Sequence, residues 1–467
     1  MIIDTIQNYI PEIVIGFSII LEVILSFSKE KLTYTISNAI AFIGLVCATY
    51  SLIDATVLPS ELYMSLLKIL ICVSGLCVLF FDSKGIFKAR STTFNIFLLS
   101  AILFSMLIIS SNDFLSLYVN IELLSIATYF LLAFDRKATT VKESLKYLVT
   151  NLVASALYLI GVAFIYGLSG SIDFNGISSR INNIHSDYTI STYIIPYTFI
   201  ISGLAFKLGV FPLANWMIDV FKRVNVKVLA YNSTIPKIAI FGAFIKVLSP
   251  VSWFEIALIM SILGLVTAFW GGFYGIKENN IKALMGCSSY INMSFIFIAA
   301  GFYTKLTIAN VLFYLVAYTI TNLGAWAGIS VLENSNYHDE NFNFQGYFYN
   351  NQFFTINFSV CIIALLGFPV TSGFIAKIYT ISGILNSGIL AIPVLFFLIF
   401  SMIIGVVFYL NILRKMFRNN PVTRNEVIET SVKNNKIILY LSSAFTIIIG
   451  LAPAWLIKMC ESISLYM

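Results

Sequence analysis

Four charged side chains stand in otherwise apolar stretches of this sequence. They are Glu122 in "SLYVNIELLSIATYF", Lys207 in "GLAFKLGVFPLANW", Lys237 in "IPKIAIFGAF" and Lys377 in "GFPVTSGFIAKIY". A carboxyl group and three amines can bind and release protons. Placing such a charge at the centre of a bilayer costs about 2.5–3.5 kcal/mol even on lenient insertion scales. If these stretches span a membrane, we therefore expect the four groups to face the protein interior or a water-filled cavity and to exchange protons there.

The composition indicates that the stretches do span a membrane. Of the 467 residues, 59% are hydrophobic and 11% are charged, and the mean hydropathy is +0.91. A soluble domain is about 45–50% apolar and about 25% charged. Runs such as "FLIFSMIIGVVFYL" do not alternate between apolar and polar residues, which excludes a β-barrel. The fold class predicted is an all-α polytopic membrane protein.

The apolar stretches predict about 14 transmembrane helices, most of them near the roughly 20 residues that a bilayer requires. We place them at 9–27, 33–53, 64–81, 93–110, 113–134, 142–168, 193–217, 228–248, 253–275, 281–301, 305–332, 353–383, 388–413 and 436–458.

Basic residues are distributed unevenly over the loops between these helices. The odd-numbered loops hold 19 Lys and Arg residues, whereas the even-numbered loops hold only Arg180 and Lys305. Basic loops remain on the cytoplasmic or matrix side, so both termini are expected on the outer, periplasmic or intermembrane, side. The net charge of +6 is thus a signal of topology, and no basic stretch interleaved with aromatics points to nucleic acid.

The sequence offers no site for an electron carrier. Its six cysteines lie in apolar segments without a C-x-x-C pair, and both histidines, His185 and His338, fall in loops. No dinucleotide-binding or P-loop motif is present. We expect this chain to bind no cofactor and no metal ion.

Other lysines in the predicted helices have simpler interpretations. Lys68, Lys246 and Lys458 lie within about two turns of a helix end, where a long side chain can extend to the headgroups. Lys146 has Glu143 three residues before it. It belongs either to the proton path or to a surface pair at the membrane boundary.

Glu122 and Lys207 are expected to form a pair. A buried carboxylate and a buried ammonium keep each other charged, and moving one partner then drives proton release from the other. A purely structural ion pair is the alternative, although buried ion pairs contribute little to stability.

Two predicted helices carry breakers beside their lysines. Pro212 follows Lys207 in the seventh, and Pro369 and Gly373 precede Lys377 in the twelfth. Broken backbone at membrane depth is tolerated where it lines a cavity or is buried in protein. Two broken helices in corresponding positions suggest two five-helix repeats, helices 4–8 and 9–13, and the odd offset makes the repeats inverted.

We accordingly divide the chain into four parts. They are an N-terminal three-helix segment at 1–92, the first repeat at 93–250, the second repeat at 251–417, and a C-terminal loop with the last helix at 418–467.

Four motifs in one order carry a family resemblance: "GLAFKLGVFPLANWMIDVFK", "VLAYNSTIPKIAIFGAF", "KENNIKALMGCSSYINMSF" and "LLGFPVTSGFIAKIY". With them the chain resembles the antiporter-like proton-channel family of respiratory complex I over helices 4 to 13. Within that family it is similar to the subunit N branch, called subunit 2 of NADH dehydrogenase in mitochondria. The lysine at 377 argues against the subunit M branch, and the length argues against subunit L.

The resemblance implies a function for the charged row. Glu122, Lys207, Lys237 and Lys377 match the family's proton-translocating positions. The chain would be a translocase subunit of an NADH:quinone oxidoreductase in a bacterial or mitochondrial inner membrane, surrounded by lipid and other membrane-arm subunits. NADH, FMN, iron–sulfur clusters and quinone would bind in those other subunits. A multisubunit cation/proton antiporter or membrane-bound hydrogenase shares these motifs, and a scaffold without transport is a third reading.

Three positions depart from the family pattern. Ala214 replaces a histidine, Ile218 replaces a proline, and Asn292 replaces a histidine in the tenth helix. An asparagine can hydrogen-bond or orient water but cannot carry a proton as histidine does. The connection between the central lysine and the twelfth helix is therefore expected to rely on Ser288, Ser289, Asn292 and water.

Overall fold

The structure is a computed structural model that describes residues 9–28, 33–54, 62–81, 86–182, 187–211, 214–251, 253–334, 346–388, 390–418 and 433–465. Within these ranges the regular structure is helical, apart from one isolated β-bridge between Asp113 and Asp173. The predicted all-α class is confirmed.

The helices, in chain order, are α2 (Ile10–Ser26), α3 (Thr33–Asp54), α4 (Leu62–Phe80), α5 (Ile86–Ala89), α6 (Ser91–Ser110), α7 (Phe114–Leu132), α8 (Ala138–Ser169), α9 (Phe174–Asn182), α10 (Asp187–Leu208), α11 (Trp216–Arg223), α12 (Val226–Asn232), α13 (Ile235–Leu248), α14 (Phe254–Lys277), α15 (Ile281–Phe302), α16 (Lys305–Asn334), α17 (Tyr347–Asn350), α18 (Gln352–Leu366), α19 (Ser372–Leu385), α20 (Ala391–Phe417), α21 (Lys433–Leu451) and α22 (Ala454–Leu465). The short helices α5, α9 and α17 were not expected from the apolar pattern, because they contain too few residues to cross a bilayer.

Helices of membrane-spanning character dominate the described residues. Eleven are long and apolar enough to cross a bilayer, and three shorter apolar helices cover 192–208, 352–366 and 372–385. The chain is a multi-pass membrane protein. The total of 14 spans, the two inverted repeats and the four-part division remain predictions.

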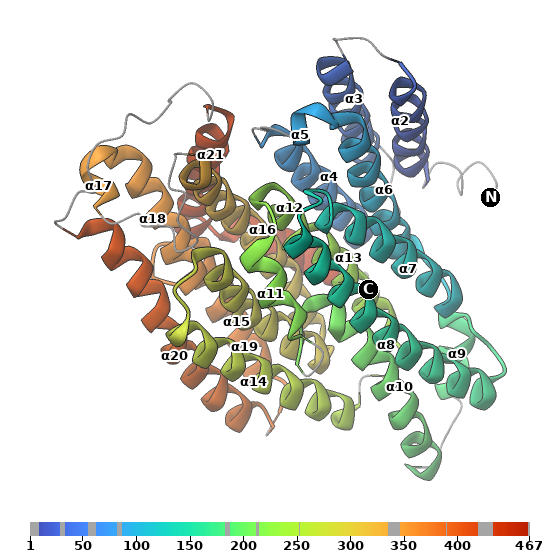
Figure 1. Ribbon diagram of the computed structural model, residues 1–467. Helices are drawn as coiled ribbons and strands as arrows, with labels where there is room; N and C mark the ends of the chain where they lie inside the picture. Colours follow the sequence, from blue (N-terminus) through green and yellow to red (C-terminus); the bar gives the residue numbers. More distant parts are fainter. Residues whose placement is uncertain are drawn as a thin grey trace.

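The helices pack with the most buried ones at the centre. The N-terminal helices α2, α3, α4 and α6 lie at one end of the molecule, and α17, α18 and α20 lie at the other (Figure 1). Between them, every residue of α13 and α15 is buried. These two helices carry Lys237 and the predicted relay residues Ser288, Ser289 and Asn292, which are therefore all buried in the interior.

The break predicted near Pro369 is present between α18 and α19. Gly367 ends α18 in the left-handed region, with φ of 88°, a conformation that glycine adopts without strain. Gly373 lies against α18 so closely that a Cβ atom there would be 1.9 Å from the carbonyl oxygen of Ala364. The predicted single helix at 353–383 is thus two helices held together at their broken ends.

The seventh predicted helix also ends early. Helix α10 ends at Leu208, and Gly209 follows it with φ of 78°. The next helix, α11, begins at Trp216. The break therefore begins before Pro212, the residue to which we had attributed it. Pro212 itself lies outside the described residues.

Two predicted helices are interrupted where we expected continuity. The helix at 228–248 is divided into α12 and α13 at Ser233 and Thr234, and Pro236 occupies the first turn of α13. The amide of Asn322 donates to the Ser233 hydroxyl at 2.7 Å, which supplies a partner at the break. The helix at 436–458 likewise divides into α21 and α22 on either side of Pro453. In both cases a proline starts a new helix.

Candidate functional site

The side-chain amide of Asn151 bridges Lys207 and Glu122 through hydrogen bonds. Helix α10 places Lys207 against α7 and α8, where its ammonium donates to the hydroxyl of Ser125 and the side-chain oxygen of Asn151. The Asn151 nitrogen donates to the Glu122 carboxylate at 3.3 Å, and the hydroxyl of Ser155 donates to the same carboxylate.

The contact between the expected partners Glu122 and Lys207 is therefore indirect. Among the described residues no ion pair within 4 Å links Lys207 to Glu122. Instead, Asn151 accepts from the ammonium on one side and donates to the carboxylate on the other. Since an amide can donate and accept simultaneously, it connects the two charges while keeping them apart.

Lys237 lies at the centre of the molecule and is 2% exposed. Its ammonium donates to the hydroxyl of Ser289 on α15, one of the residues predicted to form the relay. The Ser289 hydroxyl lies 3.0 Å from that of Tyr318 on α16. The break before α13 puts Lys237 in the first turn of a new helix.

The other two predicted relay residues belong to a neighbouring hydroxyl and amide cluster. Tyr409 donates to the Ser288 hydroxyl at 2.5 Å, and Asn292 donates to the Tyr409 oxygen at 3.4 Å. Tyr314 donates to the Asn292 side-chain oxygen at 2.9 Å. Each of these groups can reorient a hydrogen bond, although Asn292 has no acidic proton to pass on.

Lys377 is bound by the broken end of α18. Its ammonium donates to the carbonyl oxygens of Leu365 and Leu366, at 3.1 and 2.7 Å, and its chain lies over Gly367. The last carbonyls of a helix have no partner within the helix and carry partial negative charge. The break thus holds a buried cation without a carboxylate. Among the described residues no hydrogen bond links Lys377 to the Asn292 cluster.

The three lysines share one kind of environment. All are buried, and in the described structure none forms an ion pair with an acid. Each ammonium lies within 6 Å of an aromatic ring centre: 5.8 Å from Tyr147 for Lys207, 5.9 Å from Tyr318 for Lys237, and 5.6 Å from Phe295 for Lys377. Neutral oxygens and ring faces attract a cation without contributing a full negative charge.

Lys146 lies at the margin of this site. It forms an ion pair with Asp219 of α11, and the two side chains are 47% and 37% exposed. The i, i+3 pair with Glu143, one of the two alternatives for Lys146, is not among the ion pairs of the described residues. Since its ammonium contacts neither Glu122 nor Lys207, the structure does not bring Lys146 into the central network.

Two lysines assigned to the headgroups are buried instead. Lys68 forms a 2.7 Å ion pair with Glu12, with side chains 6% and 4% exposed. The ammonium of Lys246 donates to the backbone oxygen of Ser111 at 2.7 Å. Both lysines turn inward because the N-terminal helices supply an acid and a helix-end carbonyl within reach. Lys458 is exposed.

Several polar residues that contact the buried charges or the predicted relay residues, or are buried carboxylates themselves, were not identified from the sequence. They are Glu12, Glu22, Ser125, Asn151, Ser155, Tyr314, Tyr318 and Tyr409. Glu22 is completely buried in α2 and accepts from the hydroxyl of Ser37 at 2.8 Å. Carboxylates in an apolar helix were a visible signal, whereas uncharged polar residues are common in helices of this kind. The described residues contain no cluster of three or more His, Cys, Asp or Glu side chains that could hold a metal ion.

Comparisons with known proteins agree on one fold and one family. Residues 111–405 match the family described as NADH:quinone oxidoreductase/Mrp antiporter, TM. The NADH-quinone oxidoreductase subunit N of Dehalococcoides mccartyi is 28% identical over 486 positions, which cover 97% of this chain and 98% of the relative.

Solved structures share the fold at low sequence identity. A chain of respiratory complex I from Thermus thermophilus superposes with a TM-score of 0.81 at 19% identity, over 97% of this chain and 100% of the other. A chain of an archaeal membrane-bound sulfane sulfur reductase gives 0.83 at 18%, over 99% and 97%. The family resemblance indicated by the four motifs is confirmed.

Proposed function

Because this chain belongs to the NADH:quinone oxidoreductase/Mrp antiporter family, we propose that it is a proton-translocating membrane-arm subunit of an NADH:quinone oxidoreductase. The observation that carries the proposal is the row of three buried lysines held by neutral groups. A lysine in an ion pair would leave a buried carboxylate behind on losing its proton. A lysine bound to hydroxyl, amide and carbonyl oxygens does not carry that cost.

The path begins at Glu122 and Lys207. Movement or protonation of Glu122 changes the hydrogen bond that Asn151 offers, and Asn151 passes this change to the ammonium of Lys207. Lys207 thus gains or loses its proton according to the state of the carboxylate. The input of the path is a coupled acid and base, with an amide as the connection between them.

The proton then passes through the centre towards Lys377. Lys237 accepts it and exchanges it along hydrated hydroxyl groups that begin at Ser289 and Tyr318. The Ser288, Tyr409 and Asn292 cluster orients water on the way to Lys377. Release from Lys377 towards the outer side works against the membrane potential, by about 2.3 kcal/mol per charge and 100 mV. The energy for that step comes from electron transfer in other subunits.

Under this proposal the chain binds no redox group. NADH, FMN, iron–sulfur clusters and quinone bind to partner subunits, and this chain contacts the lipid bilayer, water and protons. Its membrane is a bacterial or mitochondrial inner membrane, with both termini on the outer side.

A second candidate function is supported by the family name, which also covers Mrp antiporters. In such a complex the same lysine row would exchange protons for another cation, without NADH. Co-purification separates the two: flavin and iron–sulfur subunits support the first proposal, and small antiporter subunits support the second.

The function is tested on Lys237 in the assembled, reconstituted complex. We expect Lys237→Met to abolish NADH-driven proton uptake into vesicles and Lys237→Arg to do the same, because a guanidinium does not release its proton at accessible pH. Pumping by the arginine variant at the wild-type rate would identify Lys237 as a fixed charge and overturn the proposed path. Lys458→Met, at an exposed position on α22, is the control and is expected to pump normally.

A further inference from the structure

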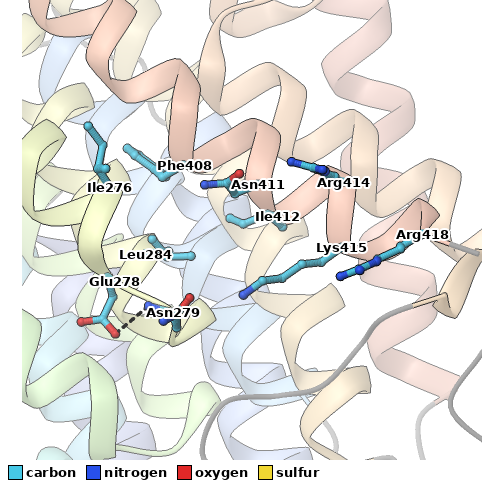
Figure 2. Close-up of a pocket in the computed structure, with 10 residues that line it drawn as sticks. All are labelled: Ile276, Glu278, Asn279, Leu284, Phe408, Asn411, Ile412, Arg414, Lys415 and Arg418. Atoms are coloured by element: carbon cyan, nitrogen blue, oxygen red, sulfur yellow. Dashed lines mark hydrogen bonds between the residues drawn. The ribbon is translucent and has the colours of Figure 1, made fainter. Parts of the chain in front are cut away.

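A basic cavity opens at the end of α20, away from the lysine row. It has a volume of about 350 Å³ and lies between the last turns of α20 and the connection from α14 to α15. Arg414, Lys415 and Arg418 line one side, and Asn279 lines the other. Figure 2 shows the side chain of Lys415 extending from α20 towards Asn279. Three cations therefore share one small space.

The acid in the cavity wall does not neutralise these cations. Glu278 forms a 2.6 Å ion pair with Lys222 and accepts from the backbone N–H groups of Asn279 and Asn280, at 3.0 Å each. Burial would raise the pKa of the Glu278 carboxyl, but the bonds from Lys222 and these N–H groups hold it below its usual value. Among the described residues no acid forms an ion pair with Arg414, Lys415 or Arg418. The described residues that line the cavity thus carry an excess of positive charge.

Part of the cavity wall is apolar and leads to exposed apolar side chains on the same two helices. Ile276 lines the cavity and is 44% exposed. Beyond it along the same two helices lie Phe273 of α14 and Val407 and Leu410 of α20, all exposed. In a membrane-spanning chain these side chains contact acyl chains or a neighbouring helix. A ligand that fills the cavity therefore meets positive charge at one end and an apolar surface at the other.

From this arrangement we propose that the cavity binds an anionic phospholipid. Its phosphate contacts Arg414, Lys415 and Arg418, and its acyl chains lie along α14 and α20. The loop charges predict this end of α20 on the cytoplasmic or matrix side, where anionic headgroups attract clustered basic residues. Arginine is suited to the phosphate because its planar group can donate two parallel hydrogen bonds. A free phosphate ion would not use the apolar wall, which is why the lipid is favoured.

The test compares two double variants of the assembled complex. Arg414→Gln with Arg418→Gln removes two cations from the cavity. Lys277→Gln with Arg223→Gln removes two exposed cations from the ends of α14 and α11, on the side predicted to be the same, outside the cavity. Native mass spectrometry of complexes titrated with phosphatidylglycerol, with phosphatidylcholine or with inorganic phosphate measures binding. NADH oxidation in phosphatidylcholine alone checks that each variant has assembled.

We expect phosphatidylglycerol to bind the cavity variant about 30-fold more weakly, since each basic residue near an anionic headgroup contributes roughly a fivefold change in affinity. The control variant should bind as the wild type does. If phosphatidylglycerol bound the wild type and the cavity variant equally, the proposal would be overturned. A partner subunit that filled the cavity would give this same result. Inorganic phosphate that bound the cavity as tightly as the lipid would also overturn it. Phosphatidylcholine that bound equally well would do the same.

Discussion

Two regions of this molecule bury lysines in opposite ways. In the N-terminal helices, Lys68 is held by the carboxylate of Glu12 at 2.7 Å, and the hydroxyl of Ser110 donates to the same carboxylate at 2.9 Å. In the central region, Lys207, Lys237 and Lys377 are held by hydroxyl, amide and backbone oxygens.

The difference shows what each arrangement permits. Without the Lys68 ammonium, Glu12 would be an uncompensated buried charge. A lysine bound by neutral oxygens leaves only neutral groups behind. Burial alone therefore does not identify a proton carrier in this chain. The charge of the group that holds each lysine distinguishes Lys68 from the three lysines of the row.

The largest expected effect comes from removing Lys68 itself. Lys68→Met leaves Glu12 buried and unpaired, which should cost about 3–5 kcal/mol of stability. Lys237→Met removes a buried cation that has no acid partner, and it should leave the thermal stability of the complex close to that of the wild type. The measurement is the thermal midpoint of the purified complexes and the amount of each in membranes.

The matched control for this pair is the double variant Glu12→Gln with Lys68→Met. Removing both charges should restore most of the stability, since no buried charge remains. If Lys68→Met were as stable as the wild type, the two regions would not differ in the way described.

A smaller effect is expected at Asn151. Asn151→Leu removes the amide between Glu122 and Lys207 and with it two hydrogen bonds to charged groups. One such bond contributes about 1.5–3 kcal/mol, so loading of Lys207 should fall roughly tenfold or more. Asn151→Asp should place an acid beside Lys207 and give it an ion pair like that of Lys68. Both variants should assemble and pump slowly, as measured by proton uptake per NADH oxidised.

Asn310→Leu is the control for Asn151. Asn310 is buried in α16 and donates to the backbone oxygen of Tyr379, outside the lysine row. Its loss should lower stability without lowering the number of protons pumped per NADH. Normal pumping by both Asn151 variants would remove the amide from the path.

The smallest effect concerns an ion pair nearer the surface, between Lys222 and Glu278, whose side chains are 32% and 12% exposed. Burial acts to raise the pKa of the Glu278 carboxyl and to lower that of the Lys222 ammonium. The hydrogen bond between the two groups acts in the opposite direction, and the pKa of the carboxyl is lowered while that of the ammonium is raised. The carboxyl then stabilises the fold above its ordinary pKa of 4.5 and loses this contribution as the pH falls further. The ammonium stabilises the fold below 10.5 and loses its contribution as the pH rises further.

Glu278→Gln should therefore lower stability by about 1 kcal/mol or less, by the same amount at about pH 6 and about pH 8. The difference from the wild type should shrink as the pH falls below 4.5. Thermal unfolding across this range is the measurement. A difference that grew as the pH fell would contradict the sign of the carboxyl shift.

The membrane class and the charged row could be read from the sequence because both are properties of single residues in a local context. Apolar runs of helical length require a bilayer or a buried core, and a charge within such a run is costly wherever the chain folds. The break at Gly367 to Gly373 could also be expected, since proline restricts the backbone and glycine permits conformations that other residues avoid. The break at Ser233 and Thr234 was visible as Pro236, but that proline was read as part of a continuous helix.

Which group holds each buried charge was decided only by the tertiary structure. Lys68 and Lys237 both lie in apolar helices, and their neighbouring residues do not show which group holds each ammonium. Their partners, Glu12 and Ser289, lie more than fifty residues away along the chain and meet them through helix packing. The same holds for Asn151, which separates Glu122 from Lys207 because α7, α8 and α10 pack together. The sequence by itself determined that charges are buried in this membrane protein. The packing of helices determined whether an acid or a neutral oxygen holds each one, because hydrogen-bond partners are chosen by distance in space.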